Sequence, residues 1–415
     1  MSRGSGEVSS SQQADPALSE LEALARQSGS LAVDTEFMGE GRYRTLLCLV
    51  QLAVRDEAGT LHTALIDPLS DELDAGPLIS LLSDPEIEVI MHAGRQDTAL
   101  LRRRFDTEVT AIFDTQVAAG FAGFAAQASY HTLLREVLTI DLTKTASFTR
   151  WDARPLSKEQ LRYAREDALH LPELATELKR RLHTAKRLEW ALQECQAVQC
   201  ASDARDLESV FLRLPRVRNL SAAAQAVARE LVEWREQVAA AGDRPVQGVL
   251  ADAVLVEVAK RKPASIHQLQ GIRGMGPGTL RRDGQGLLDA IRRGADRPHE
   301  PLAQLPRTTR SDTRDAALIA LCEALVRART IEAGLAYELV ASRSDLQAIV
   351  AAKRVNHAEP DVRTLRGWRR ELVGEELLEL LDGRVSLSSQ NASLRVATAR
   401  QQSRTGRLLR GRHQA

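Results

Sequence analysis

The chain has 415 residues, and its 56 Lys and Arg side chains balance 56 Asp and Glu side chains, so the formal net charge is zero. This length predicts two or three domains, because single hydrophobic cores stop growing beyond roughly 250–300 residues. The neutral overall charge gives no argument for a nucleic-acid partner, although six arginines and no acidic residue follow position 386.

The composition also indicates in which cellular compartment the protein is found. Hydrophobic residues make up 43% and charged residues 27% of the chain, which is typical of a soluble globular protein. The longest apolar run, at 46–54, is far shorter than a membrane-spanning helix, and the polar segment 1–16 does not resemble a secretory signal. The four cysteines are scattered without C-x-x-C spacing, which argues against a zinc site and favours a reducing compartment. We therefore expect a cytoplasmic protein without a membrane partner.

The first half of the chain alternates short apolar segments with helical signals. We predict strands at 30–37, 45–54, 61–69, 88–92 and 111–113, and helices at 76–83, at 98–104 and from Asp114 onward. A further helix is expected to have Ser157 as its N-cap, to break at Pro172 and to resume to about 184. Adjacent early strands followed by alternation predict a mixed sheet flanked by helices.

Strand signals disappear after Pro215. We predict helices at 222–240, 249–260, 265–269 and 287–293, and a second helical unit that echoes this one. The predicted organisation is a disordered lead at 1–16, an α/β domain at 17–205, a helical domain at 206–295, a linker at 296–312, a second helical domain at 313–385 and a basic flexible tail at 386–415.

Two acidic residues lie close together on the first predicted strand. Asp34 and Glu36 are two positions apart, so their side chains point to the same face of the strand. Carboxylates on an apolar strand are costly unless they are paired or hold a metal ion. The alternative, in which both residues lie past the strand end in solvent, fits this motif equally well.

Two more acidic residues lie on predicted helices. Asp97 follows Gly94 near a helix start, where it can turn back to the sheet edge or simply interact with the helix dipole. Tyr163 lies four residues before Asp167 and shares its helical face, either as a surface pair or as a phenol beside a metal ligand. If the fold gathers all four carboxylates, they form an oxygen-ligand cage for divalent cations, which suits phosphodiester hydrolysis.

The three acidic segments, LAVDTEF, MHAGRQDTALL and YAREDALHL, resemble the three motifs of the DEDD superfamily of 3′–5′ exonucleases. That superfamily divides into a branch with tyrosine four residues before the last aspartate and a branch with histidine five residues before it. This sequence resembles the tyrosine branch, because Tyr163 lies four residues before Asp167 and Arg162 lies five before it. FDTQVAAGF, ARPLSKEQLRYAREDALHL and the helical units after Pro215 resemble the ribonuclease D family over roughly 31–383. Within this span the first helical unit resembles the helicase-and-ribonuclease-D C-terminal (HRDC) domain.

This resemblance implies an α/β plus all-α fold, with a DnaQ-like (ribonuclease H-like) mixed sheet followed by two small HRDC-type domains. It implies that Asp34, Glu36 and Asp167 hold one Mg²⁺ or Mn²⁺, that Asp34 bridges to a second ion, and that Asp97 supports the second ion through water. Tyr163 would position the attacking water. The implied activity is trimming of tRNA precursors from a free RNA 3′ end, with release of nucleoside 5′-monophosphates and without an obligate protein partner.

Five residues are predicted, against the alternative of plain surface loops and turns, to contact nucleic acid: Lys144, Arg150, Trp151, Arg281 and Arg282. His92 is expected to be structural, and Asp114 is expected to be a helix N-cap. Two rival functions stay open from the sequence. One is a DNA 3′–5′ exonuclease with the same site, and the other is an inactive nuclease fold that only binds nucleic acid.

Overall fold

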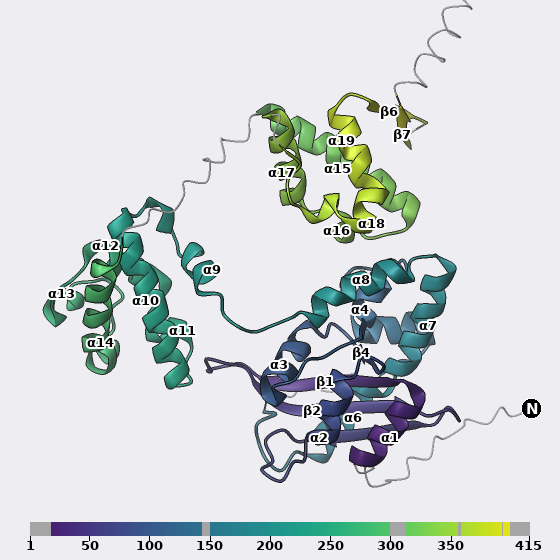
Figure 1. The fold of residues 1–415 in the computed structure, drawn as a ribbon, viewed down its shortest axis with the longest axis horizontal. Coiled ribbons are helices and arrows are strands. Elements are labelled where there is room, and N and C mark those ends of the chain that lie inside the picture. The colour runs from purple at the N-terminus through teal and green to yellow at the C-terminus, as the bar shows by residue number, and fades with distance from the viewer. Residues whose placement is uncertain (1–17, 143–149, 299–312, 356–357, 392, 399–415) are drawn as a thin grey trace, which may run out of the picture.

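The computed structural model describes residues 18–142, 150–298, 313–355, 358–391 and 393–398. They form an N-terminal α/β domain, a helical domain and a second helical domain near the C-terminus (Figure 1). This order confirms the predicted fold class. The predicted lead at 1–16, most of the linker at 296–312 and the end of the tail lie outside the described residues.

A five-stranded mixed sheet forms the centre of the first domain, in the order β3-β2-β1-β4-β5. β1 pairs antiparallel with β2 and parallel with β4, so it lies in the middle of the sheet. The interior of β2 is buried throughout, which explains its almost entirely apolar sequence. The strands β1 to β5 span Ser30–Met38, Leu46–Arg55, Leu61–Ile66, Glu88–Met91 and Ile112–Asp114.

Helices cover both faces of this sheet. Alternation along β1 sends Leu31 and Val33 into one core and Ala32 into the other, which also contains α7 residues. Asp34 and Glu36 share the parity of Ala32 and therefore lie on the α7 side. The helices are α1 Leu18–Ser28, α2 Gly76–Ser83, α3 Arg95–Phe105, α4 Thr115–Phe121, α5 Tyr130–Leu133 with a π-helical turn Leu134–Leu138, α6 Lys158–Leu169, α7 Leu171–Thr184 and α8 Leu188–Gln199.

The first helical domain has a separate apolar core. It contains α9 Leu207–Leu212, a 3₁₀ turn Val217–Asn219, α10 Ala222–Ala241, α11 Val246–Val249, α12 Asp252–Arg261, α13 Ile266–Gln270 and α14 Pro277–Asp296. Two helix predictions were wrong in their bounds: 249–260 is divided between α11 and α12, and 287–293 is only the second half of α14. Gly294 of α14 serves packing, because a Cβ there would lie 2.7 Å from Val227 Cα on α10.

The β1–β2 connection joins this domain to the sheet. Tyr43 packs against the helical core, and its backbone N–H donates to Asp243 Oδ1 at 3.1 Å. Arg42 forms an ion pair with the same carboxylate at 2.8 Å. The segment that follows the Asp34–Glu36 strand is therefore tied to the helical domain.

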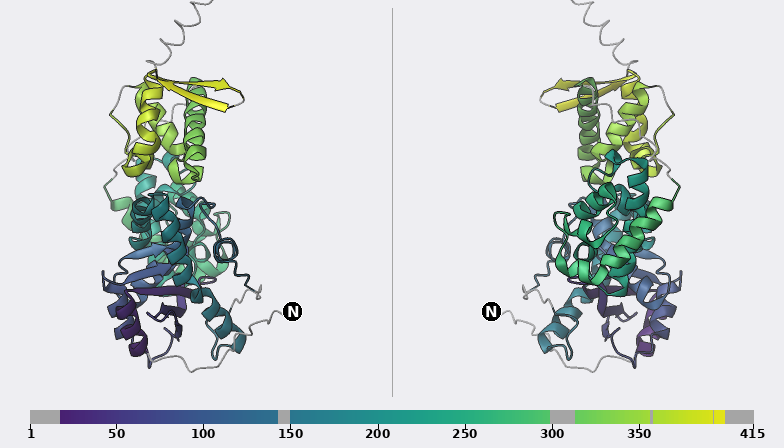
Figure 2. Two further views of the ribbon diagram at one scale, coloured as in Figure 1. Left: turned by 90° about the vertical axis from the view of Figure 1, so that its right-hand side faces the viewer. Right: turned by 90° about the vertical axis from the view of Figure 1, so that its left-hand side faces the viewer.

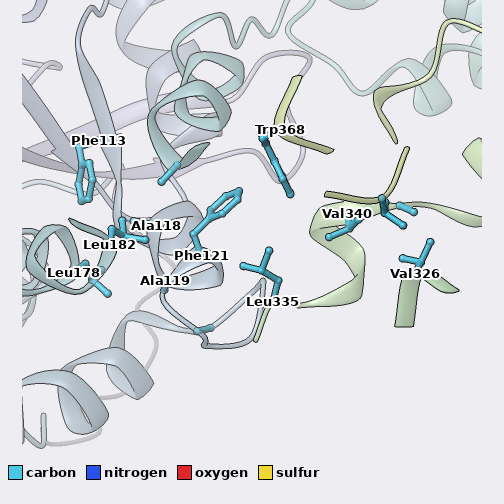
Figure 3. Packing of buried hydrophobic residues seen from close by; sticks show 14 of the residues in the cluster. Phe113, Ala118, Ala119, Phe121, Leu178, Leu182, Val326, Leu335, Val340 and Trp368 are labelled. Atoms are coloured by element: carbon cyan, nitrogen blue, oxygen red, sulfur yellow. The ribbon is translucent and has the colours of Figure 1, made fainter. Parts of the chain in front are cut away.

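The second helical domain shares a hydrophobic core with the α/β domain. Trp368 stacks on Trp190 of α8 with ring centroids 5.2 Å apart. It also meets Phe121 of α4 edge-on at 5.1 Å, and Figure 3 shows these two rings side by side. The domain contains α15 Thr313–Ala333, α16 Tyr337–Val340, α17 Arg343–Arg354, a 3₁₀ turn Arg363–Leu365, α18 Gly367–Arg369, a π-helical turn Arg370–Gly374 and α19 Glu375–Leu381.

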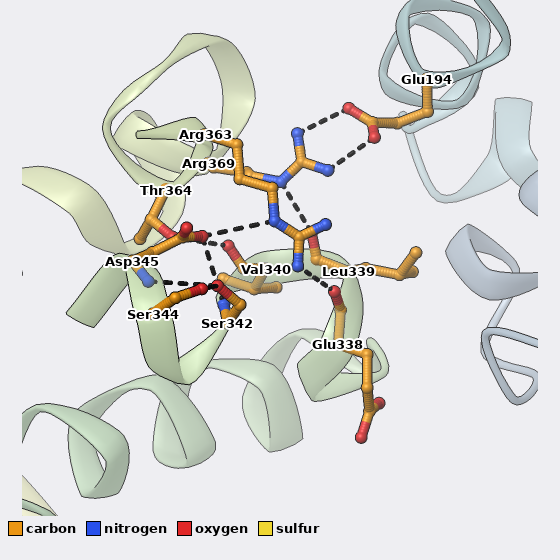
Figure 4. Close-up of polar contacts among 10 residues, drawn as sticks. All are labelled: Glu194, Glu338, Leu339, Val340, Ser342, Ser344, Asp345, Arg363, Thr364 and Arg369. Atoms are coloured by element: carbon orange, nitrogen blue, oxygen red, sulfur yellow. Dashed lines mark hydrogen bonds and ion pairs between the residues drawn. The ribbon is translucent and has the colours of Figure 1, made fainter. Parts of the chain in front are cut away.

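A polar contact beside Trp368 fixes the same junction (Figure 4). The Arg369 guanidinium makes two hydrogen bonds of 2.6 Å to the Glu194 carboxylate of α8, and its Nε donates to Leu339 O at 2.7 Å. A bidentate pair of this kind fixes orientation as well as distance. The aromatic stack and this pair together hold the C-terminal domain against α4 and α8.

The prediction of a flexible tail at 386–415 is wrong for the residues up to 398. Val385–Gln390 and Ser393–Thr398 form an antiparallel hairpin, β6–β7, which lies at the top of both views in Figure 2. Val385 is buried, and Leu387 and Val396 pack beside it on the shared core, so alternating apolar residues support the strands. Asn391 adopts a φ of +50° after β6, a conformation that asparagine tolerates. The arginines and serines of this segment concealed that alternation.

No helix within the described ranges combines the length and apolar character that crossing a bilayer requires.

Replacing Trp368 with alanine should lower the free energy of unfolding by about 3–5 kcal/mol, because it removes a buried aromatic ring from the junction. Chemical denaturation measures this change when it is followed by far-ultraviolet circular dichroism, which reports on the backbone and does not depend on the removed tryptophan. Ile331→Ala, at a side chain that is 80% exposed in the same domain, is the matched control and should change stability little. Equal effects of the two substitutions would contradict the proposed packing.

Candidate active site

The end of β1 extends past its parallel neighbour. β4 pairs with β1 only from Ser30 to Ala32, whereas β2 continues alongside β1 as far as Met38. Asp34 and Glu36 therefore lie where the sheet is open on the β4 side, and both are partly exposed. A register shift between Glu36 and Phe37 interrupts the regular pairing directly after the second acid. The strand prediction is confirmed, and neither carboxylate lies beyond the strand in solvent.

The turn between β4 and α3 places Asp97 beside β1. Asp114, at the end of β5, accepts hydrogen bonds from Ala93 N at 3.2 Å and Gly94 N at 2.8 Å, and it caps α4 as predicted. A Cβ on Gly94 would lie 2.7 Å from Met91 Cβ, so this tight turn requires glycine. The buried Asp97 carboxylate then accepts a hydrogen bond from the Thr35 hydroxyl, between Asp34 and Glu36 on the strand.

Helix α6 brings Tyr163 and Asp167 over the same side of the sheet. Ser157 and Gln160 form a capping box at its start, which confirms the predicted N-cap. Ala164 and Ala168 are fully buried, and their small side chains let α6 approach the strands closely. The Tyr163 hydroxyl is hydrogen-bonded to Asp167, as the spacing of four residues along a helix permits. The predicted tyrosine–aspartate pair therefore faces the sheet and not the solvent.

The residues predicted to contact nucleic acid have different environments. Trp151 is buried, and its ring lies 6.1 Å from that of Tyr163, so it supports the tyrosine from behind and is not available to stack on a base. Polar residues surround Trp151 in the sequence, so the segment was predicted to lie on the surface. Arg150 is exposed and paired with Asp152. Arg281 and Arg282 are exposed in the first turns of α14, and Lys144 lies outside the described residues.

Burial raises the pKa values of all four carboxyl groups, and repulsion from the other carboxylates of the set adds to this for Asp34 and Glu36. Desolvation, followed by the charges of Asp97, Asp167 and Glu36, holds the pKa of Asp34 well above its usual value. Desolvation and the charges of Asp167 and Asp97 raise the pKa of Glu36 to about 8. Burial raises the pKa of Asp97 to about 6 and that of Asp167 to about 7, although hydrogen bonds from Thr35 and Tyr163 oppose these shifts. Groups that interact this strongly must be neighbours.

The carboxylates are neighbours without having metal-ligand geometry. Across the described part of the chain, no three His, Cys, Asp or Glu side chains are close enough to one another to hold a metal ion as they stand. Electrostatic coupling acts over a longer distance than ligation, so the two observations are compatible. Asp97 is hydrogen-bonded to Thr35, and Asp167 is hydrogen-bonded to Tyr163. Side-chain rotations would have to bring the carboxylate oxygens together before they could bind one metal ion. The donor set, four hard oxygen ligands with unfavourable mutual charge, fits a divalent cation.

Sequence reasoning missed Tyr130 at the start of α5. Its side chain is partly buried, its hydroxyl accepts a hydrogen bond from His170 N at 3.2 Å, and its ring lies 5.6 Å from that of His92. Burial and the charges of Asp167 and Asp34 raise its pKa. His92 also contacts the Thr115 hydroxyl through Nδ1 at 3.0 Å, which agrees with its expected structural role. No spacing rule links Tyr130 to the acidic motifs, so only the fold reveals it.

Glu36→Gln should stabilise the metal-free protein in a pH-dependent manner. The folded chain holds the Glu36 proton more tightly than the unfolded chain, so the stability contributed by this group is present at low pH and lost as the pH rises towards about 8. Glutamine has no such proton. In EDTA, the melting temperatures should agree near pH 5, and that of the variant should exceed that of the wild type near pH 8.5. A difference in melting temperature that does not depend on pH would contradict the raised pKa of Glu36.

Comparisons with known proteins agree with this geometry. The family model described as 3′-5′ exonuclease matches residues 7–183, and the HRDC domain model matches residues 224–291. Ribonuclease D of Gluconacetobacter diazotrophicus is 35% identical over 87% of this chain and 90% of its own length. Ribonuclease D of Granulibacter bethesdensis is 34% identical over 92% of this chain and 94% of its own length.

Structural comparison gives the same result. The crystal structure of Escherichia coli RNase D, described as an exoribonuclease involved in structured RNA processing, aligns with 88% of this chain and 96% of its own chain. The TM-score is 0.75 and the sequence identity is 27%. Both the sheet domain and the helical domains are included in a match of this extent. This chain therefore belongs to the ribonuclease D family of divalent-metal-dependent 3′–5′ exoribonucleases.

Proposed function

We propose that this exoribonuclease removes nucleotides from the 3′ ends of tRNA precursors by two-metal hydrolysis at Asp34, Glu36, Asp97 and Asp167. The observation that carries the proposal is the electrostatic coupling of carboxylates from β1, α3 and α6, since three distant segments converge on one sheet edge. In this proposal Asp34, Glu36 and Asp167 would hold one ion. Asp34 and Asp97 would help to hold a second.

Each side chain has a distinct part in this mechanism. Bound Mg²⁺ or Mn²⁺ supplies Lewis-acid chemistry, in which a pair of ions activates the attacking water and stabilises the leaving oxygen. The four carboxylates supply negative charge that attracts and orients the cations. Thr35 holds Asp97 by donating its hydroxyl proton, and the backbone amides around Gly94 fix the turn that precedes it.

Tyr163 is suited to orient the attacking water. Burial and the charges of Asp167 and Glu36 raise the pKa of its phenol, so the hydroxyl stays protonated at neutral pH. The hydroxyl proton is directed to Asp167, and the lone pairs of a phenol oxygen can accept a hydrogen bond from water. Trp151 behind the ring limits the positions that the phenol can adopt.

The helical domains supply the affinity for structured RNA. Arg281 and Arg282, exposed at the start of α14, can contact phosphates with sequence-independent affinity. The HRDC match at 224–291 includes both residues. A tRNA precursor presents a single-stranded 3′ extension beside a folded body, so one part of the substrate can enter the catalytic domain while the helical domains bind the other. We further propose that this reaction takes place in the cytoplasm.

Asp167→Asn should reduce the hydrolysis of a 3′-extended tRNA transcript by at least about 10³-fold, because loss of a metal ligand removes several kcal/mol of transition-state stabilisation. Products are resolved by length and released nucleotides are identified as 5′-monophosphates, with and without EDTA. Glu159→Gln, at an exposed acid of the same helix, is the matched control and should retain activity. Near wild-type hydrolysis by Asp167→Asn would refute the site, and faster degradation of a matched DNA strand would refute the substrate class.

Tyr163→Phe should lower kcat by roughly 10²-fold, in the range for loss of a group that directs proton transfer. KM for RNA and the affinity for Mn²⁺ should stay close to wild type, because phenylalanine preserves the contact with Trp151. Single-turnover kinetics and calorimetric Mn²⁺ titration separate these effects. An unchanged single-turnover rate would remove Tyr163 from the mechanism.

A further inference from the structure

Gln51 is a polar residue in the middle of an apolar strand. The run from Leu46 to Val54 on β2 contains no other polar side chain except that of Cys48, and Gln51 has no exposed surface. Within the described residues, neither its amide nitrogen nor its amide oxygen has a hydrogen-bond partner. A buried, unpaired amide is unfavourable, and an apolar side chain of similar volume would fill the same space without this cost. The position therefore calls for a functional explanation.

The strand register places Gln51 directly opposite Asp34. The two residues are paired across β1 and β2, so their side chains project to the same face of the sheet. Opposite Cβ atoms in antiparallel strands are about 4.5–5.5 Å apart, and the glutamine amide lies one methylene beyond its Cβ. On the other side, Gln51 is paired with Leu65, which packs against the core below α6. Asp34 is thus the acceptor that the register brings beside the amide.

We propose that Gln51 is a positioning residue that donates an Nε2–H hydrogen bond to the Asp34 carboxylate and holds it in the orientation that binds the divalent cation. Asp34 is the most central of the four carboxylates, because it is coupled to each of the other three. The inference rests on the proposed role of Asp34 as a metal ligand.

Gln51→Met tests this role, because methionine keeps the side-chain length and removes the amide. Calorimetric titration of the EDTA-stripped protein with Mn²⁺ should show roughly 10–100-fold weaker binding, the usual effect of losing a group that orients a metal ligand. The metal-free variant should be at least as stable as the wild type, since an unpaired buried amide has been removed. Wild-type Mn²⁺ affinity would overturn the proposal, and so would a variant that fails to fold.

Gln225→Met is the matched control. Gln225 is also a buried glutamine, but its amide donates to Val217 O and Leu220 O in the first helical domain, far from Asp34 in the sequence. Its replacement should lower the melting temperature and leave Mn²⁺ affinity unchanged. A loss of Mn²⁺ affinity in this control equal to that in Gln51→Met would also overturn the proposal.

Asp34→Asn separates this inference from the proposed function. If Asp34→Asn binds Mn²⁺ as tightly as the wild type, the metal site itself is misassigned. If Asp34→Asn loses the affinity and Gln51→Met keeps it, only the role of Gln51 fails. In the double variant, Gln51→Met should cause little further loss, because its effect acts through Asp34.

Discussion

The desolvation and repulsion of four partly or fully buried carboxylates are the constraint on which the rest of this structure depends. Asp34 and Glu36 on β1, Asp97 on α3 and Asp167 on α6 lie close enough to raise one another's pKa values or to share a desolvated environment. Such a cluster is unfavourable in isolation and becomes favourable with divalent cations. The fold must therefore hold these groups together against their own charge, and several features of the scaffold serve that purpose.

Those features act on the backbone more than on the carboxylates. Asp114 binds the amides of the β4–α3 turn, and Gly94 makes that turn possible, so the position of Asp97 is set from β5. Buried alanines let α6 approach the sheet, and Trp151 supports Tyr163. The C-terminal domain shares its core with α4 and α8 through Trp368, so its packing also stabilises the β5 side of the site.

Local signals in the sequence were sufficient for most of the α/β domain. The i, i+2 spacing of Asp34 and Glu36, the i, i+4 spacing of Tyr163 and Asp167, and the N-caps at Ser157 and Asp114 each depend on neighbouring residues alone. Long-range packing decided the features that were missed. Trp151 is buried by α6, Gly294 packs against α10 inside a continuous helix, and Val385 begins a hairpin supported by another part of the chain. Tyr130 joins the site only through the fold.

We propose that these carboxylates form one cation site at the end of β1. Their side chains do not yet surround a common point in the described structure, so the ligation geometry is the decisive property. Anomalous X-ray diffraction from crystals grown with Mn²⁺ measures it most directly. We expect Mn²⁺ within about 2.0–2.6 Å of oxygens from Asp34, Glu36 and Asp167. Manganese bound elsewhere, or by a set of residues that omits Asp34, would contradict it.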